Sequence, residues 1–276
     1  MLGKLLKHEF RATGRVMLPV LGVLLVLACF ANLSFSAMDK VDNSVLELLM
    51  GLLIAAFFIG VVAALVVVVV LMINRFYTNL LKDEGYLMFT LPASVHSIVW
   101  SKLIVSLVWF VVTGLVVMLA MFITVFTFSA MDFGEIFNNV PSFKELMAQF
   151  YAATGLSGGD VAGFIAEFIG LVLVSLLCTC LHIYAAMSLG HIFSNHKVIL
   201  SVLFFVGISF LFQILTAVRG FSLGNSLDAM LPFETSGEMW QLAHNGLLAV
   251  MLYELALSAI LYFTTTFSLR KGLNLA

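Results

Sequence analysis

Six long apolar runs set the main constraint on how this chain of 276 residues can fold. A helix needs about 20 predominantly apolar residues to cross the hydrocarbon core of a bilayer, and each run is near or above that length. Inside the bilayer every backbone N–H and C=O must be paired within the protein, which favours α-helices. The runs cover residues 16–37, 46–74, 99–128, 161–190, 198–217 and 244–268. The sequence therefore predicts an all-α, polytopic membrane protein with six transmembrane helices.

The low content of charged residues argues against any additional soluble domain. Charged residues make up 10% of the chain, compared with about 25% in soluble domains. No polar stretch is long enough to fold outside the bilayer, so we expect one integral membrane domain over residues 1–276. The net charge of −2 provides no basic excess for nucleic acid. The lipid bilayer is an expected partner and nucleic acid is not.

The basic residues predict the orientation of the six spans. Short cytoplasmic loops collect Lys and Arg, so the side with more of them faces the cytoplasm. With both termini inside, ten basic residues are cytoplasmic and three are external. The cytoplasmic ones are Lys4, Lys7, Arg11, Arg15, Arg75, Lys82, Lys102, Lys197, Arg270 and Lys271, and the external ones are Lys40, Lys144 and Arg219. Both termini are therefore predicted to be cytoplasmic.

The residues before the first run predict an amphipathic helix. At 100° per residue the basic side chains share one face and mostly apolar side chains share the other. The basic face holds Lys4, Lys7, His8, Arg11 and Arg15, and the other holds Leu2, Leu5, Leu6, Phe10 and Thr13. We expect this helix to lie on the cytoplasmic leaflet. A signal peptide ending in "SFSA" is the alternative, and the two-faced helix argues against it.

Glu9 is an exception, because its carboxylate falls among the apolar residues of that helix. Two arrangements stay open for it. The side chain reaches sideways to water, or it forms a salt bridge with Arg75 or Lys102, which flank the charged loop after the second run.

That loop, "RFYTNLLKDEGYLMFTLPASVHSIVWSK" at residues 75–102, holds the densest group of charges between two spans. The helical pattern of the second run continues through Leu81, and Gly85 is expected to end it. The apolar stretch "YLMFTLP" is too short to span. Such a loop fits a groove on a partner protein, with charged side chains at the rim. The rim residues are Arg75, Lys82, Asp83 and Glu84. A loop anchored in the interface by Tyr86, Phe89 and Trp100, without a partner, is the alternative.

Two further segments are predicted to be external. Residues 129–160 include "PSFKELMAQFYAATG", which predicts a short helix from a capping box at Ser142 to a stop at Gly155. Residues 218–243 form a second external segment of mixed character.

Motifs typical of nucleotide hydrolases, zinc peptidases and thiol redox proteins are missing from the sequence. The chain has no G-x-x-x-x-G-K-[ST], HExxH or CxxC stretch, and no catalytic residue and no metal ligand is assigned. Glu254 and His182 are the candidates for a translocation path, because ionisable residues inside spans are costly and often functional. Structural hydrogen bonds to neighbouring helices are the alternative for both.

The N-terminal basic helix, the six spans with both termini inside, and the loop "RFYTNLLKDEGYLMFTLPASVHSIVWSKL" together resemble the permease subunits of type-two ABC exporters. They are also similar in topology to the ABC transporter G subfamily. In those proteins the N-terminal helix is a connecting helix, and the loop between the second and third spans carries a coupling helix that docks into the ATPase. The specific match covers only about residues 1–16 and 75–103.

The resemblance implies roles for the residues at matching positions. The coupling positions are Arg75, Glu84, Gly85, Tyr86, Leu91, Pro92, Ser101 and Lys102, with Lys82 and Asp83 beside them. The connecting helix includes Lys4, Lys7, Glu9, Arg11 and Arg15. The absence of a fused ATPase fits the bacterial arrangement, in which ATPase and permease are separate chains.

On this resemblance the chain is a multi-pass permease of the bacterial plasma membrane rather than an enzyme. It would pair with a second permease, identical or paralogous, and with an ABC ATPase that holds the ATP and Mg, so no cofactor is expected on this chain. Its sparse intramembrane charge favours an amphipathic substrate over an inorganic ion. Two alternatives stay open: an intramembrane enzyme in which Glu254 and His182 converge, and a non-transporting scaffold that recruits an ATPase.

Overall fold

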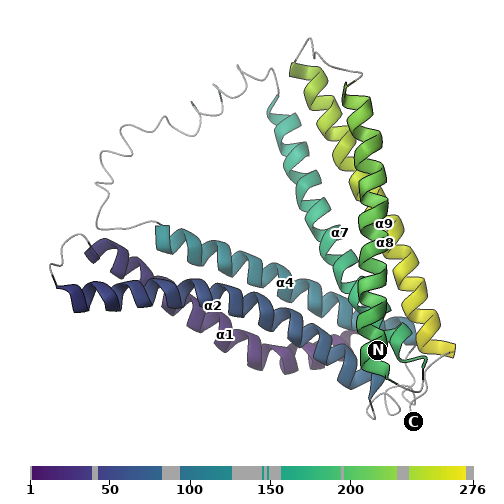
Figure 1. Ribbon diagram of the computed structural model, residues 1–276, viewed down its shortest axis with the longest axis horizontal. Coiled ribbons are helices and arrows are strands. Elements are labelled where there is room, and N and C mark those ends of the chain that lie inside the picture. The colour runs from purple at the N-terminus through teal and green to yellow at the C-terminus, as the bar shows by residue number, and fades with distance from the viewer. Residues whose placement is uncertain are drawn as a thin grey trace. The chain divides into compact units, whose positions relative to one another are not determined.

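The computed structural model describes residues 2–38, 43–82, 94–125, 145, 148, 157–193, 196–228 and 236–271. The regular elements are α1 (Leu2–Met38), α2 (Ser44–Phe76), the π-helical turn η1 (Tyr77–Leu81), α4 (Val95–Val125), α7 (Gly158–Gly190), α8 (Lys197–Asp228) and α9 (Ser236–Lys271) (Figure 1). These described residues contain no β-strand. The predicted all-α class is confirmed.

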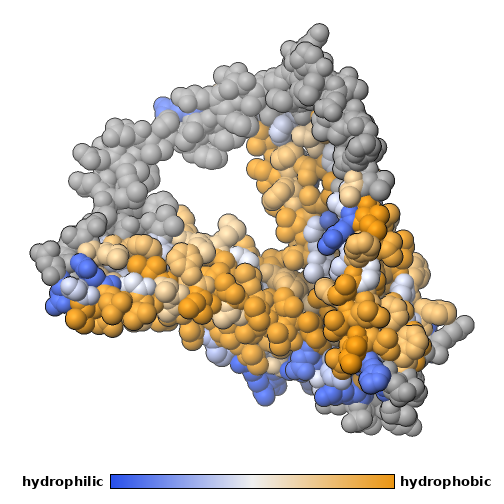
Figure 2. Space-filling model, viewed as in Figure 1, coloured by the Kyte–Doolittle hydropathy of each residue, from blue (hydrophilic) through white to orange (hydrophobic). Residues whose placement is uncertain are grey.

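All six long helices are apolar enough, over a sufficient length, to cross a bilayer. The 37 residues of α1 extend over about 55 Å at 1.5 Å per residue, well beyond a hydrocarbon core of about 30 Å. Large hydrophobic side chains are exposed along each helix, and Figure 2 shows them covering much of the visible surface of the helices. Such surfaces are unfavourable in water and suit lipid tails. The protein is therefore a multi-pass membrane protein.

The N-terminal segment is helical, but it is not a separate helix. The described helix continues without interruption from Leu2 to Met38. Pro19 lies inside it, and proline lacks the N–H that would bond to the carbonyl four residues earlier, that of Arg15. Arg15 is also where the predicted interfacial helix ends. The position of residues 2–15 on a leaflet stays a prediction.

One predicted boundary is wrong. The extension of α2 ends at Leu81 and not at Gly85, because η1 closes with a bond of 3.2 Å from the Lys82 N–H to the Tyr77 carbonyl, and Lys82 is already extended. Much of the predicted external segment 218–243 is helical, since α8 continues to Asp228 and α9 begins at Ser236. Its external placement stays a prediction. Gly and Ser lower hydropathy there without stopping a helix. The predicted helix at 142–155 lies outside the described residues, apart from two single helical positions.

The contacts divide the described chain into two compact units, and α2 and α4 each contribute to both. Unit 1 comprises α1, α2 up to Arg75 and α4 from Trp100. Unit 2 comprises Phe76, η1, the first turn of α4 up to Val99, and α7, α8 and α9.

Unit 1 is a group of three helices with two apolar clusters between them. Buried residues recur along α1 at spacings of three and four, which places them on one face of the helix. They are Met17, Leu21, Leu24, Ala28 and Ala31. The later ones pack with Phe57, Val61 and Ala64 of α2, and the earlier ones with Val68. Since residue numbers rise on α1 as they fall on α2, these two helices are antiparallel.

Helices α1 and α4 run in the same direction. Trp109 of α4 donates a hydrogen bond of 2.7 Å from Nε1 to Thr13 Oγ1. Further along both helices, Asn32 donates a bond of 2.6 Å to the carbonyl of Ile123. The first residues of α1 and α4 therefore lie at the same end of unit 1. This agrees with the alternating directions of the predicted six-span topology.

Unit 2 follows the same pattern with α7 in the middle. Phe164 and Trp240 lie near the starts of α7 and α9, and their ring centroids are 4.8 Å apart. The next contact along both helices joins Glu167 to His244, so α7 and α9 are parallel. Helix α8 is antiparallel to α7 and returns through a short turn after Gly190.

Candidate functional site

The predicted coupling loop is described only at its two ends. Six of its predicted residues, namely Asp83, Glu84, Gly85, Tyr86, Leu91 and Pro92, lie outside the described residues. Arg75, Lys82 and Lys102 are described: Arg75 is half-buried, Lys82 is exposed and Lys102 is buried. The geometry of the site therefore comes from the two stems, which are residues 76–82 and 94–99.

The first stem is held against α7 by aromatic contacts. Phe76 stacks on Tyr184, with ring centroids 4.0 Å apart and ring planes 13° apart. Both side chains are buried, with at most 1% exposed. Tyr77, the next residue, meets the edge of the His191 ring at 5.4 Å. A stacked pair this deeply buried fixes the end of α2 on the last turns of α7.

The second stem is held against α9 by a polar contact. His96, in the first turn of α4, lies 2.6 Å from the hydroxyl of Tyr262 through its Nδ1 atom. The two rings also lie roughly parallel, with centroids 5.8 Å apart. Both ends of the loop are thus fixed on helices of unit 2.

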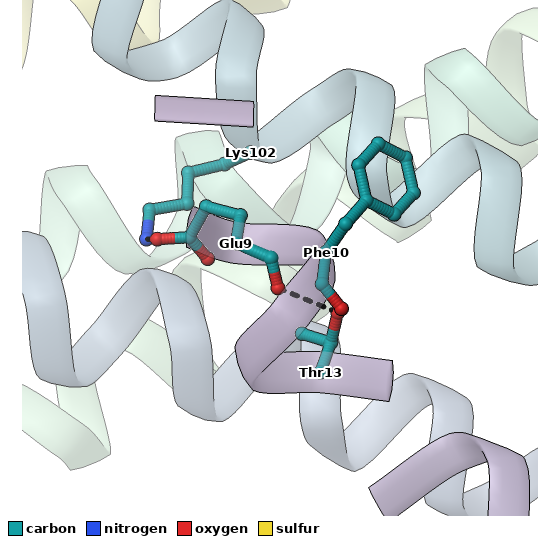
Figure 3. A network of polar contacts seen from close by, with 4 residues as sticks. All are labelled: Glu9, Phe10, Thr13 and Lys102. Carbon is teal, nitrogen blue, oxygen red and sulfur yellow. Dashed lines mark hydrogen bonds and ion pairs between the residues drawn. The ribbon is translucent and has the colours of Figure 1, made fainter. Parts of the chain in front are cut away.

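The N-terminal helix is fixed to α4 by a buried ion pair (Figure 3). Lys102 Nζ contacts the Glu9 carboxylate, and only 2% of the lysine side chain and 10% of the glutamate side chain are exposed. One turn later Thr13 donates a bond of 2.8 Å to the Glu9 carbonyl and accepts the bond from Trp109. Of the arrangements left open for Glu9, the salt bridge is confirmed, and Lys102 is the partner.

The basic residues of this helix lie away from that contact. Lys4, Lys7, Arg11 and Arg15 are all exposed, whereas Glu9 is buried. The interfacial amphipathic helix expected over these residues stays a prediction. The exposed basic face is the part that would meet anionic headgroups.

Glu254 and His182 have partners on different helices. The carboxylate of Glu254 on α9 accepts a hydrogen bond from the Ser175 hydroxyl of α7. His182, two turns further along α7, lies 3.2 Å from the Phe205 carbonyl through Nε2, and its ring stacks on the Phe205 ring. These contacts match the structural alternative, and they do not bring the two residues together as a catalytic pair.

A polar pair between α7 and α9, His244 and Glu167, was not predicted from the sequence. His244 Nδ1 lies 2.8 and 2.9 Å from the two oxygens of the Glu167 carboxylate. Glu167 and Phe164 are three residues apart on α7, and Trp240 and His244 are four apart on α9. Both spacings place the residues on one helix face. That periodicity was available in the sequence, but the pairing of the fourth span with the sixth was not.

Neither protein-family models, curated protein sequences nor solved structures give a match to this chain.

Proposed function

We propose that this chain is the membrane-spanning permease subunit of an ATP-driven exporter in the bacterial plasma membrane. Two such subunits, identical or paralogous, would enclose the substrate path, and a separate ATPase pair would bind ATP and Mg. Residues 83–93 would contact the ATPase. The proposal draws on the resemblance of residues 1–16 and 75–103 to exporter permeases and on the way the described stems are anchored.

The observation that carries the proposal is the anchoring of both stems of the loop. Phe76 is stacked on Tyr184 of α7, and His96 is bonded to Tyr262 of α9. A surface loop that only rested on the membrane would not need rigid contacts at both ends. A loop that a partner protein moves does need such contacts at both ends. Without them the stems would bend, and the movement of the loop would not reach the membrane-spanning helices.

The N-terminal helix would take part in the same motion through α4. The buried Glu9–Lys102 contact joins α1 to α4, and Lys102 lies seven residues after the start of α4. A movement of the start of α4 would therefore be passed to α1. Closure of the ATPases around ATP would push on the loop, and the spans would change which side of the membrane the path opens to.

The first experiment tests whether an ATPase binds at residues 83–93. The chain is purified from its native membrane in mild detergent, beside a Glu84→Arg/Tyr86→Ala variant, and copurifying proteins are identified by mass spectrometry. We expect a P-loop ATPase with the unaltered chain and its loss with the variant. Glu47→Arg, a charge reversal at the start of α2, is the control and should retain the ATPase. No ATPase in any sample would overturn the proposal.

A second variant separates transport from recruitment. Tyr262→Phe removes only the hydroxyl that contacts His96, so it should still copurify with the ATPase. In reconstituted vesicles we expect fewer substrate molecules moved per ATP hydrolysed. A scaffold that merely recruits the ATPase predicts no substrate stimulation of hydrolysis in either protein. An intramembrane enzyme predicts activity without the ATPase and its loss in Glu254→Gln.

A further inference from the structure

A cavity lies between the first turns of α7 and α9, away from the loop stems. Its volume is about 320 Å³, within the range of small-molecule sites. Phe164 and Glu167 line it from α7, and Trp240 and His244 line it from α9. Under the orientation predicted from the basic residues, this end of both helices faces outward.

The aromatic wall of the cavity consists of two rings that contact each other. The Phe164 and Trp240 rings have centroids 4.8 Å apart and planes tilted by 40°. Aromatic faces carry negative charge density, and Trp is the aromatic side chain that attracts a cation most strongly. The wall therefore suits either an apolar group or a positive charge.

The polar wall is acidic. Asp160 and Glu167 supply two carboxylates, and His244 is the residue paired with Glu167. The Glu167 side chain is only 20% exposed, so its charge is less screened by water than that of a surface carboxylate. A carboxylate can accept several hydrogen bonds, so Glu167 can serve as an acceptor for a cationic ligand as well as for His244.

Two other classes of ligand fit less well. A helix N-terminus attracts anions, but at the start of α7 the Asp160 carboxylate already accepts bonds of 2.8 and 2.7 Å from the Ser157 N–H and hydroxyl. Within the described part of the chain, no three His, Cys, Asp or Glu side chains converge as metal ligands. The cavity thus combines negative charge with aromatic surface.

We propose that this cavity binds an organic ammonium compound that carries an apolar group. The ammonium group donates to the Glu167 carboxylate, and the apolar group lies against Phe164 and Trp240. Binding needs no ATPase and no second permease, so this inference stands or falls independently of the exporter function.

The test uses phenethylammonium as the probe and 3-phenylpropionate, of similar size and opposite charge, as its control. Binding to the full chain in lipid nanodiscs is measured by isothermal titration calorimetry. We expect saturable binding of the ammonium compound only. Glu167→Gln should weaken it about tenfold or more, because a charge-assisted hydrogen bond is lost. Trp240→Leu should weaken it as well through loss of the aromatic surface that contacts the apolar group.

Glu47→Gln is the control, because it neutralises an exposed carboxylate at the start of α2 that does not line the cavity. Its affinity should equal that of the unaltered chain. Equal binding of the two probes, absence of binding at millimolar concentration, or unchanged affinity in folded Glu167→Gln would overturn the proposal. If Glu167→Gln does not fold, Trp240→Leu takes its place in the test, and unchanged affinity in folded Trp240→Leu would overturn the proposal.

Discussion

Breaking the Glu9–Lys102 contact by neutralising one partner should destabilise unit 1 strongly. The contact joins two charges whose side chains are 10% and 2% exposed. Glu9→Gln leaves the lysine charge buried without its carboxylate, and Lys102→Met does the converse. Removing one partner of a buried ion pair typically costs about 3–5 kcal/mol, mostly as the desolvation penalty of the charge that remains.

Replacing both partners should have a much smaller effect. The Glu9→Leu/Lys102→Met variant has no charge at either of these two positions, and apolar side chains of similar length fill the space. Apolar replacements of buried ion pairs are often neutral or stabilising. The loss in the double variant should therefore be well below the sum of the two single losses, which makes the coupling energy large.

The assay is thermal unfolding of the purified chain in one detergent, followed by loss of the monodisperse peak in size-exclusion chromatography. Arg11→Gln, an exposed position on the same helix, is the control and should stay within about 0.5 kcal/mol of the unaltered chain. Single variants as stable as this control would refute the reasoning. A double variant as unstable as the sum of the single variants would also refute it, because packing and not charge would then be the cause.

Two further predictions concern the turn between α7 and α8. In Gly190→Ala the new Cβ would clash with Ser201 Oγ and lie 2.5 Å from the Ser201 backbone N, so we expect overpacking of about 1–3 kcal/mol in the same unfolding assay. Gly207→Ala, with no atom within 4 Å of the new Cβ, should be tolerated, and equal midpoints would contradict the prediction. Burial lowers the pKa of His191 below its usual value near 6.5, and the charge of Lys197 acts in the same direction. The unfolded state then takes up the proton first as pH falls, so the unfolding midpoint should drop between pH 7.5 and 5.5, and drop less in His191→Gln.

The spans were predictable because hydrocarbon thickness imposes a length that apolar runs must match. The ends of the helices were not predictable, since polar residues such as those after Ala217 can continue a helix beyond the membrane-spanning part. The stop at Leu81 was missed for a similar reason: a π turn ended the helix without the glycine that usually marks an end. Local sequence rules describe what begins and stops an α-helix, and they contain little about such turns.

The contacts of the site were predictable only where a physical penalty limited the choices. A carboxylate among apolar residues needs a cation, so Glu9 had few available partners and one of the two named was correct. Phe76 and Tyr184 carry no such penalty, because any aromatic side chain can be buried against many others. Their pairing across a long stretch of sequence, like that of Glu167 with His244, required the structure.

The close turn between α7 and α8 has a consequence for how the protein is made. Gly190 and Ser201 touch although they are eleven residues apart in the sequence, so these two helices can pair as soon as both have left the ribosome. Glu167 and Ser175 of α7 cannot form their contacts with His244 and Glu254, respectively, until α9 has been synthesised. Synthesis of the last span would then supply the polar partners of a hairpin that can form before it.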